Sequence, residues 1–307
     1  PSRTKTGQYK TDVKVLERLA VNHDIAQRML DFRTRRKLKT TYVDQLPAAI
    51  FELTQRVHTT YDQAVTATGR MQSHSPNLQN IPIRTERGKE IRRAFVPKSD
   101  NFRLLSADYS QIELRIIAEL SQDKALISAF KNGSDIHSET AARLFGVPYD
   151  QVDDEMRRRA KMVNYGIVYG ISPFGLSQRL GIPRREASRI IDQYFNQFPS
   201  VLFYIERVIA FAHEHGYVET MTGRRRYLPD IHSQNATMRN GAERNAVNSP
   251  IQGSAADLIK LAMSGIYQAL AEHDLQTQMI LQVHDELLFD LHRDEEETVI
   301  SLVLEKM

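Results

Sequence analysis

Two apolar segments near the end of the chain are separated by only three residues, and this spacing constrains the fold more than any other feature. Residues 278–283 (QMILQV) and 287–292 (LLFDLH) have the composition of strands, and His284, Asp285 and Glu286 lie between them. So short a link predicts a tight turn between the two strands. Turns built only for geometry favour Asn-Gly or Asp-Gly, so three consecutive polar side chains point to a functional turn.

A second strand also ends on a carboxylate. Residues 103–108 (RLLSAD) read as a short buried strand that ends at Asp108, and a helix over 112–121 follows within a few residues. Either Asp108 or Asp285 alone could be an ordinary helix cap or turn residue. Both together, in a chain without Cys, predict a shared site for a hard cation such as Mg²⁺, since thiolate zinc sites and disulfides are excluded. Two such ions can assist an in-line phosphoryl displacement.

The remaining pattern predicts a predominantly helical α+β protein. Its helical periods, loops and breakers predict these segments: helices over 13–39 and 46–68, a loop over 69–82, helices from 134 to 212 broken at 146–148, 170–173 and 181–183, a possible hairpin over 216–229, a helix-rich segment over 242–273, and a helix over 294–307.

Composition narrows the class of protein. The 307 residues include 41 Lys and Arg against 38 Asp and Glu, a net charge of +3, with 41% hydrophobic and 26% charged residues. These values are typical of a globular chain and exclude a disordered or highly basic packaging protein. No apolar stretch approaches the ~20 residues that cross a bilayer. We therefore expect a protein without membrane contact, located inside the cell, either cytoplasmic or nucleoid-associated.

The charge is unevenly distributed along the chain. Residues 1–40 hold eleven basic residues, one of which is Lys5, and four acidic residues, a net charge of +7. Residues 268–307 hold two basic and ten acidic residues, a net charge of −8. This asymmetry suggests a basic surface for a polyanion beside an acidic region for cations, although any single run of charge is more often a solvated helix face.

A third segment, RRRAKMVNYGIVYG at 157–170, places cations and aromatic rings on one side of a helix. Four residues succeed one another at intervals of four: Arg157, Lys161, Tyr165 and Tyr169. Cations can bind a phosphate chain and an aromatic face can pack on a sugar or base, as a nucleoside triphosphate requires. Spacing alone leaves an amphipathic helix with half-buried tyrosines equally open.

These segments resemble a known family. DYSQIELR at 108–115, RRRAKMVNYGIVYG at 157–170 and VHDE at 283–286 are similar to motifs A, B and C of the family A DNA polymerases, the DNA polymerase I group. The similarity extends over nearly the whole chain and includes four further segments: TGRMQSHSPNLQNIP at 68–82, DIHSETAARLFGVP at 135–148, GRRRYLPD at 223–230 and NSPIQGSAADLIKLAM at 248–263.

The resemblance implies a right-hand polymerase architecture with an antiparallel-sheet palm, helical fingers and part of a thumb. Its parts would be the thumb base at 1–45, the first palm part with motif A at 46–114, the fingers with the motif B helix at 115–244, and the second palm part with motif C at 245–307. Because the chain opens on Pro1 and stops at Met307 within a helical stripe, we expect it to be cut from a longer protein. No segment of these residues resembles a 3′→5′ or 5′→3′ exonuclease, so we expect no exonuclease activity from this part of the protein.

The resemblance also implies roles for the acids. Asp108 and Asp285, with the Tyr109 carbonyl, would bind two catalytic Mg²⁺ ions, for which Mn²⁺ could substitute, and Glu286 would be a supporting acid. The implied reaction adds dNTPs to a primer 3′-hydroxyl and releases pyrophosphate, in DNA replication or repair.

Contacts to the nucleotide follow from motifs A and B. Lys161 would also be catalytic, as the proton donor to pyrophosphate, and Glu113 would exclude a ribose 2′-hydroxyl. The extra hydroxyl of Tyr165, where many relatives have Phe, suggests weak discrimination against dideoxynucleotides. The complete set of implied nucleotide contacts is Arg157, Lys161, Tyr165, Tyr169, His137, Glu113 and Gln111.

Contacts to primer-template DNA are implied elsewhere, several of them in the minor groove, where polar donors can test base-pair geometry without reading sequence. Arg244 would bind template backbone, and the basic N-terminal segment would grip duplex phosphates. The implied DNA contacts are Arg70, Asn77, Asn80, Arg244, Asn248, Gln252 and His284. The enzyme is expected to act as a monomer.

Three alternatives remain open at this level. A single-subunit RNA polymerase or reverse transcriptase has a similar palm, although Glu113 argues against it. A metal-dependent nuclease needs the same carboxylates but has no use for the cation and tyrosine series on 157–169. A DNA-binding module without catalysis would not need Asp108 or Asp285.

Overall fold

The computed structural model describes Arg3, residues 6–82 and residues 86–307, and it divides into two compact units. Pro1 and Lys5 lie outside the described part. Unit 1 comprises Pro1–Asp62 and Gln72–Pro97, and unit 2 comprises Gln63–Met71 and Lys98–Met307. The short segment 63–71 thus belongs to unit 2, although unit 1 flanks it on both sides in the sequence. The predominantly helical α+β character predicted from the sequence is confirmed.

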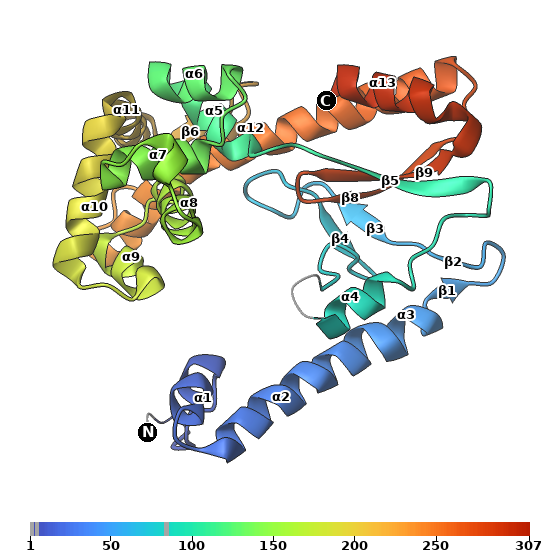
Figure 1. The fold of residues 1–307 in the computed structure, drawn as a ribbon, viewed down its shortest axis with the longest axis horizontal. Coiled ribbons are helices and arrows are strands. Elements are labelled where there is room, and N and C mark those ends of the chain that lie inside the picture. Colours follow the sequence, from blue (N-terminus) through green and yellow to red (C-terminus); the bar gives the residue numbers. More distant parts are fainter. Residues whose placement is uncertain (1–2, 4–5, 83–85) are drawn as a thin grey trace. The chain divides into compact units, whose positions relative to one another are not determined.

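Unit 1 consists of helices and two small antiparallel sheets (Figure 1). Its elements are α1 (Val13–Ala20), α2 (Asp24–Leu38), a π-helical turn η1 (Lys39–Asp44), α3 (Gln45–Ala48), β1 (Ile50–Phe51), β2 (Arg56–Val57), β3 (Thr60–Asp62), β4 (Gln72–His74) and α4 (Glu86–Arg92). β1 pairs with β2, and β3 pairs with β4.

Unit 1 contains the main errors of the sequence prediction. The continuous helix over 46–68 is wrong, because the chain forms β1, β2 and β3 there, and β-branched residues such as Val57 and Thr60 suit extended backbone. The helix over 13–39 is interrupted between α1 and α2, and the loop over 69–82 contains β4. Thr59 explains part of the difference, because its hydroxyl bonds to Ser73 Oγ at 2.6 Å, a long-range contact invisible in local periodicity.

Unit 2 contains a group of helices and a three-stranded sheet. The helices and short turns are α5 (Ile112–Ser121), α6 (Lys124–Lys131), α7 (Ile136–Phe145), η2 (Tyr149–Gln151), α8 (Asp154–Val168), α9 (Pro173–Leu180), α10 (Arg184–Gln197), α11 (Pro199–His215), α12 (Ala236–Glu272), η3 (Arg293–Glu295) and α13 (Glu296–Lys306). The strands are β5 (Phe102–Asp108), β6 (Tyr217–Glu219), β7 (Arg225–Tyr227), β8 (Gln278–Val283) and β9 (Glu286–His292).

Most sequence predictions for unit 2 are confirmed. The helix over 112–121 and the hairpins β6–β7 and β8–β9 form where expected. The predicted breaks at 146 and 181 are helix ends at which Gly146 (φ 66°) and Gly181 (φ 68°) adopt the left-handed conformation that glycine tolerates. α12 is longer than predicted, since it starts at Ala236 and continues through Pro250.

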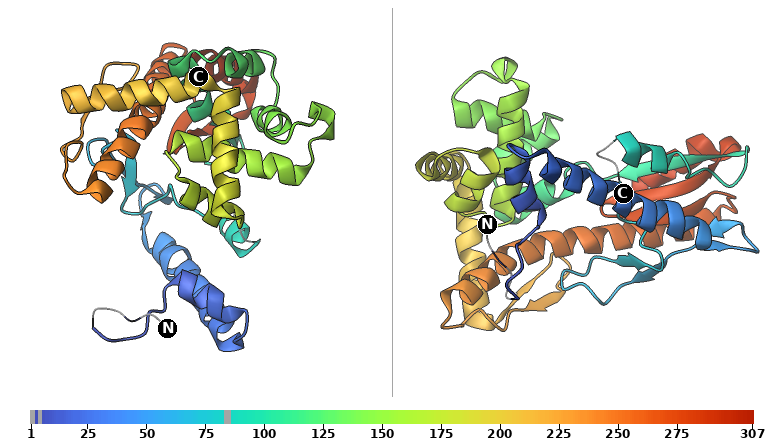
Figure 2. Two further views of the ribbon diagram at one scale, coloured as in Figure 1. Left: turned by 90° about the vertical axis from the view of Figure 1, so that its left-hand side faces the viewer. Right: turned by 90° about the horizontal axis from the view of Figure 1, so that it is seen from below.

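The sheet of unit 2 has strand order β5-β9-β8, with both pairs antiparallel. One face of its central strand packs Leu287, Phe289 and Leu291 against Ile266 of α12 and Val299 of α13. α12 (orange) runs from the group of helices to this sheet in both Figure 1 and the right view of Figure 2. Among the described residues, no helix is both long and apolar enough to cross a membrane.

Candidate active site

Three carboxylates meet at one end of the three-stranded sheet. Asp108 at the end of β5 pairs with Glu286 at the start of β9, and the Tyr109 amide donates to the Asp285 carbonyl at 3.2 Å. His284 adopts a φ of 56° in the turn between β8 and β9. Antiparallel pairing of β5 with β9 therefore brings together the two strand ends that the sequence singles out, although they are far apart in the chain.

The electrostatics of this edge suit a cation. Partial desolvation raises the pKa of the Asp108 carboxyl, and repulsion from Glu286 and Asp285 raises it further, against a hydrogen bond from the Tyr109 amide. Arg70 Nη2 lies 4.0 Å from Asp285 Oδ1. Carboxylates that repel one another supply oxygen donors of the kind that Mg²⁺ or Mn²⁺ binds.

The protein does not supply a complete ligand cage there. Within the described ranges, no group of three or more His, Asp or Glu side chains is placed to hold a metal ion. Mg²⁺ commonly binds proteins through one or two carboxylates and completes its shell with water and substrate phosphates. The carboxylates of Asp108 and Asp285 fit that partial donor set, and the Tyr109 carbonyl as a further ligand stays a prediction. Ser106 Oγ donates to a carboxylate oxygen of Glu286, so Glu286 has a protein partner of its own.

Glu113 connects this edge to the end of α8. Its side chain is buried in the first turn of α5, shortly after Gln111, which adopts a left-handed conformation. Arg70 Nη2 donates to one Glu113 oxygen at 2.7 Å, and the Tyr169 hydroxyl donates to the other at 2.5 Å. Burial and this bond to Glu113 both raise the pKa of the Tyr169 hydroxyl. Both oxygens of the buried carboxylate are thus satisfied.

α8 presents the predicted series of cations and rings, and Tyr169 is its C-cap residue. Lys161 is exposed and forms no ion pair with any residue that the structure describes. Burial raises the pKa of the Tyr165 hydroxyl, and Glu113, Asp285 and Asp108 raise it further, so this ring lies within electrostatic reach of the acidic edge.

Arg157 is already paired. Its Nε and Nη2 donate to the two oxygens of Asp135 at 2.7 and 3.2 Å. Although partial burial acts to raise the pKa of Asp135, its bonds to Arg157 and Ser138 lower it to about 2. Asp135 was not predicted as a partner of Arg157, although its place as the N-cap residue at the start of DIHSET was a signal for an ordered carboxylate.

His137 lies inside the protein rather than at its surface. The residue is only 2% exposed, its Nδ1 bonds to Asn164 at 3.1 Å, and its ring lies 5.8 Å from the Tyr165 ring. Burial lowers its pKa to about 4, so the ring is neutral at pH 7. In this conformation the His137 ring packs beside the Tyr165 ring, and its predicted contact with a triphosphate remains a prediction.

The predicted DNA contacts are divided between the two units. α12 carries Arg244, Asn248 and Gln252 at four-residue intervals on one side, and the Oδ1 atom of Asn248 is buried without a hydrogen-bond partner among the described residues. A small recess on unit 2 is lined by residues that include Arg70, His284, Asp285 and also Lys260, which the sequence analysis did not select. Unit 1 holds the remaining two, Asn77 and Asn80.

Comparison with known proteins identifies the family. A family model described as DNA polymerase family A matches residues 1–307. The chain belongs to DNA polymerase family A. DNA polymerase I of Caldicellulosiruptor bescii is 51% identical over 305 residues, 99% of this chain and 36% of that protein. DNA polymerase I of Bacillus subtilis is 50% identical over 305 residues, 99% of this chain and 34% of that protein.

A solved structure of the family has the same fold. The POL domain of Pol1 from M. smegmatis, in complex with DNA primer-template and dNTP, superimposes with a TM-score of 0.92 at 47% identity, covering 99% of this chain and 54% of that one. The chain spans about a third of the length of the curated relatives it matches. The predicted family and its helical α+β polymerase fold are therefore confirmed.

Proposed function

We propose that this chain carries the polymerase centre of an enzyme that extends a DNA primer on a DNA template with dNTPs and releases pyrophosphate. The observation that carries the proposal is the acidic sheet edge connected through Glu113 to the end of α8. Support comes from the related POL domain, which was solved with primer-template and dNTP. We further propose that the centre acts as a monomer and has no exonuclease activity of its own.

The residues at the sheet edge would organise the reacting oxygens. Asp108 and Asp285, with the Tyr109 carbonyl, would hold two divalent cations, and Glu286 would add negative charge beside them. Bound there, Mg²⁺ would lower the pKa of the primer 3′-hydroxyl and neutralise the triphosphate and the departing pyrophosphate.

The exposed side of α8 would bind the incoming nucleotide. Lys161, unpaired among the described residues, is free to contact the triphosphate and to donate a proton to the pyrophosphate. Arg157 would contact a phosphate either while it stays paired with Asp135 or after that ion pair breaks. The Tyr165 hydroxyl would bond near the sugar 3′ position, and the buried Glu113 carboxylate would exclude a 2′-hydroxyl.

The DNA would be bound without reading its sequence. Arg70, Asn248, Gln252 and His284 would probe acceptors that all correct base pairs share in the minor groove. Arg244 would bind template phosphates. Binding should weaken steeply with salt, because cationic contacts to phosphate release counterions.

Primer extension tests the proposal. The full-length protein is assayed with Mg²⁺, a labelled primer, a defined template and either dNTPs or rNTPs, beside Asp285→Ala and Asp108→Ala. A matched control is Asp294→Ala, because the Asp294 side chain is 91% exposed. We expect template-dependent extension with dNTPs by the wild type and the control, and its loss in both active-site variants. Absence of template-dependent extension by the wild type would refute the proposal.

A further inference from the structure

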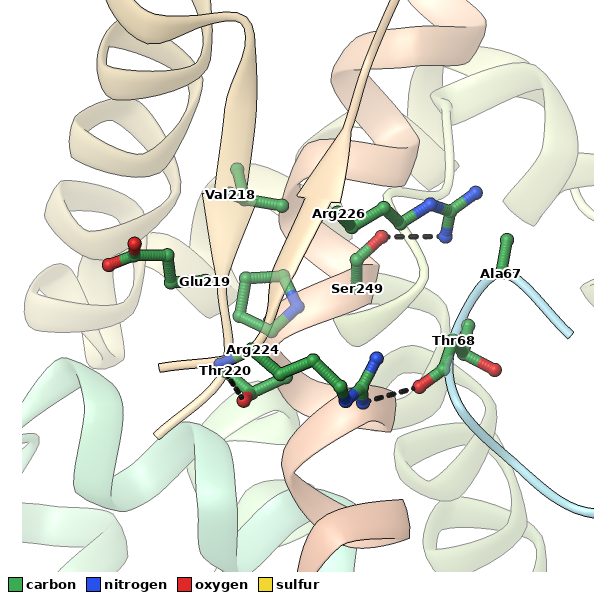
Figure 3. A pocket seen from close by; sticks show the side chains of 9 residues that line it. Ala67, Thr68, Val218, Glu219, Thr220, Arg224, Arg226 and Ser249 are labelled. Atoms are coloured by element: carbon green, nitrogen blue, oxygen red, sulfur yellow. Dashed lines mark hydrogen bonds between the residues drawn. The ribbon is translucent and has the colours of Figure 1, made fainter. Parts of the chain in front are cut away.

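The guanidinium of Arg224 binds the backbone of the segment 63–71, which carries Arg70. Arg224 lies in the connection between β6 and β7, and its side chain points at the backbone of this segment (Figure 3). Its Nη2 donates to the Thr68 carbonyl at 2.7 Å and to the Gly253 carbonyl at 3.2 Å. Its Nε donates to Asp257 Oδ1 at 2.9 Å. One planar group therefore ties the segment to α12.

Two glycines make room for this guanidinium. A Cβ atom at Gly69, which has a φ of 81°, would lie 2.6 Å from Arg224 Cζ. A Cβ atom at Gly253 would lie 2.9 Å from Arg224 Nη2 and 2.5 Å from Thr220 Cγ2. Real Cβ atoms do not approach so closely, so a side chain at either glycine would displace the guanidinium or the backbone that it contacts.

The partner of Arg224 on α12, Asp257, carries a negative charge in a fixed position. The Asp257 side chain is only 11% exposed, and its second oxygen accepts a bond from Thr222 at 2.6 Å. Burial alone would raise the pKa of Asp257, but bonds from Thr222, Thr220 and Arg224 lower it below its usual value. Arg224 thus bridges a buried, ionised aspartate and a backbone carbonyl that is remote in sequence.

Two hydrogen bonds within the segment link the backbone around Thr68 to Arg70, which lies two residues further along the chain. The Gly69 amide donates to the Thr66 carbonyl at 3.1 Å, and the Thr66 hydroxyl donates to the Arg70 carbonyl at 2.6 Å. The backbone on both sides of Thr68 therefore forms a turn that two hydrogen bonds close. From this turn the Arg70 side chain reaches Glu113.

We propose that Arg224 is a positioning residue, which fixes the 63–71 segment on α12 and thereby holds the Arg70 guanidinium between Glu113 and Asp285. This inference rests on the proposed function, since its consequence is faster nucleotide incorporation. Arg224 is not among the nucleotide or DNA contacts predicted from the sequence.

Arg224→Lys in the full-length protein tests the placement directly. Lysine keeps the charge but cannot present the fixed fork that three acceptors require. We expect amide hydrogen exchange in a peptide covering 64–71 to accelerate at least about tenfold, the effect of losing one charge-assisted bond. The matched control is Arg225→Lys, because the Arg225 side chain is exposed and pairs with Glu219 at 2.8 Å. This control should leave the exchange rate of the 64–71 peptide unchanged. Unchanged exchange in Arg224→Lys overturns the proposal.

Incorporation kinetics test the route through Arg70. The single-turnover rate of dNTP addition should fall by about tenfold or more in Arg224→Lys. Adding Arg224→Lys to Arg70→Ala should cause no further loss, because the positioned group is already absent. Additive losses would show that Arg224 acts by another route and would overturn the proposal.

The exchange measurement needs no catalysis, so it separates the two proposals. If the wild type does not extend primers, the proposed function fails, while exchange at 64–71 still decides whether Arg224 holds the segment. Gly253→Ala reaches the same contact from α12, where its Cβ would lie 2.9 Å from Arg224 Nη2, and it replaces Arg224→Lys if that variant does not fold. Amide exchange in the 64–71 peptide should accelerate in Gly253→Ala, and unchanged exchange in the folded variant contradicts the proposal.

Discussion

Two buried tyrosine hydroxyls of unit 2 have opposite environments, which makes Tyr→Phe substitution a controlled test of the Glu113 network. The Tyr169 hydroxyl donates to Glu113 at 2.5 Å, whereas the Tyr204 hydroxyl is buried without any hydrogen-bond partner among the described residues. Phenylalanine preserves the ring at both positions and removes one oxygen. Tyr169→Phe should therefore lower the free energy of unfolding, whereas Tyr204→Phe should leave it unchanged or raise it.

The structure sets the magnitudes. A hydrogen bond to a charged group contributes about 1.5–3 kcal/mol, so Tyr169→Phe should destabilise the protein by roughly that amount. Its cost is limited because Glu113 keeps the 2.7 Å bond from Arg70. Tyr204→Phe removes an unsatisfied polar atom from a residue that is 3% exposed, and it should be neutral or stabilising by up to about 1 kcal/mol. The phenylalanine ring would keep the packing of the Tyr204 ring, including the Arg207 guanidinium 5.9 Å from its centre.

Urea unfolding monitored by circular dichroism measures both changes, with the denaturation midpoint compared at an unchanged slope. We expect the midpoint of Tyr169→Phe below that of the wild type and the midpoint of Tyr204→Phe at or above it. Equal losses in the two variants would refute the reasoning, because they would show that the oxygen itself, and not its partner, determines the effect.

Three further predictions concern nucleotide choice and pH. Tyr165→Phe should increase discrimination against ddATP over dATP by several-fold, as expected for one lost hydrogen bond of about 1 kcal/mol; equal ratios in competition assays would contradict this. The pKa of His137 is about 4 in the folded protein, against an ordinary value of 6.5. Its contribution to stability is therefore complete above pH 6.5, and up to about 3 kcal/mol of the free energy of unfolding is lost as the pH falls toward 4. The free energy of unfolding of His137→Gln, which cannot titrate, should depend less on pH over that window. The pKa of Asp135 is about 2 in the folded protein, against an ordinary value of 3.8. Its contribution to stability is therefore present above pH 3.8 and disappears as the pH falls toward 2. Asp135→Asn, which keeps the helix cap, should lose less stability across that window than the wild type, and the control Asp294→Asn should behave as the wild type.

Local sequence signals predicted the elements that depend on local spacing. The three polar residues between two apolar segments could only join β8 to β9 by a tight turn, and that hairpin formed as expected. The helix over 112–121 and the helix ends at Gly146 and Gly181 follow from apolar periodicity and from the left-handed backbone that glycine allows. The prediction failed over 46–68, where contacts such as Thr59 with Ser73 favour extended backbone over a helix.

The sequence by itself determined the family, the α+β class and the identity of the acids at two strand ends, because motifs and residue periods are properties of neighbouring residues. Only the tertiary structure decided the partners. It paired Arg157 with Asp135, buried His137 beside the Tyr165 ring, and joined Arg224 to Thr68 across 156 positions of the chain. These outcomes depend on how distant segments pack, since the strength of a hydrogen bond or ion pair is set by distance and burial, which no local pattern encodes.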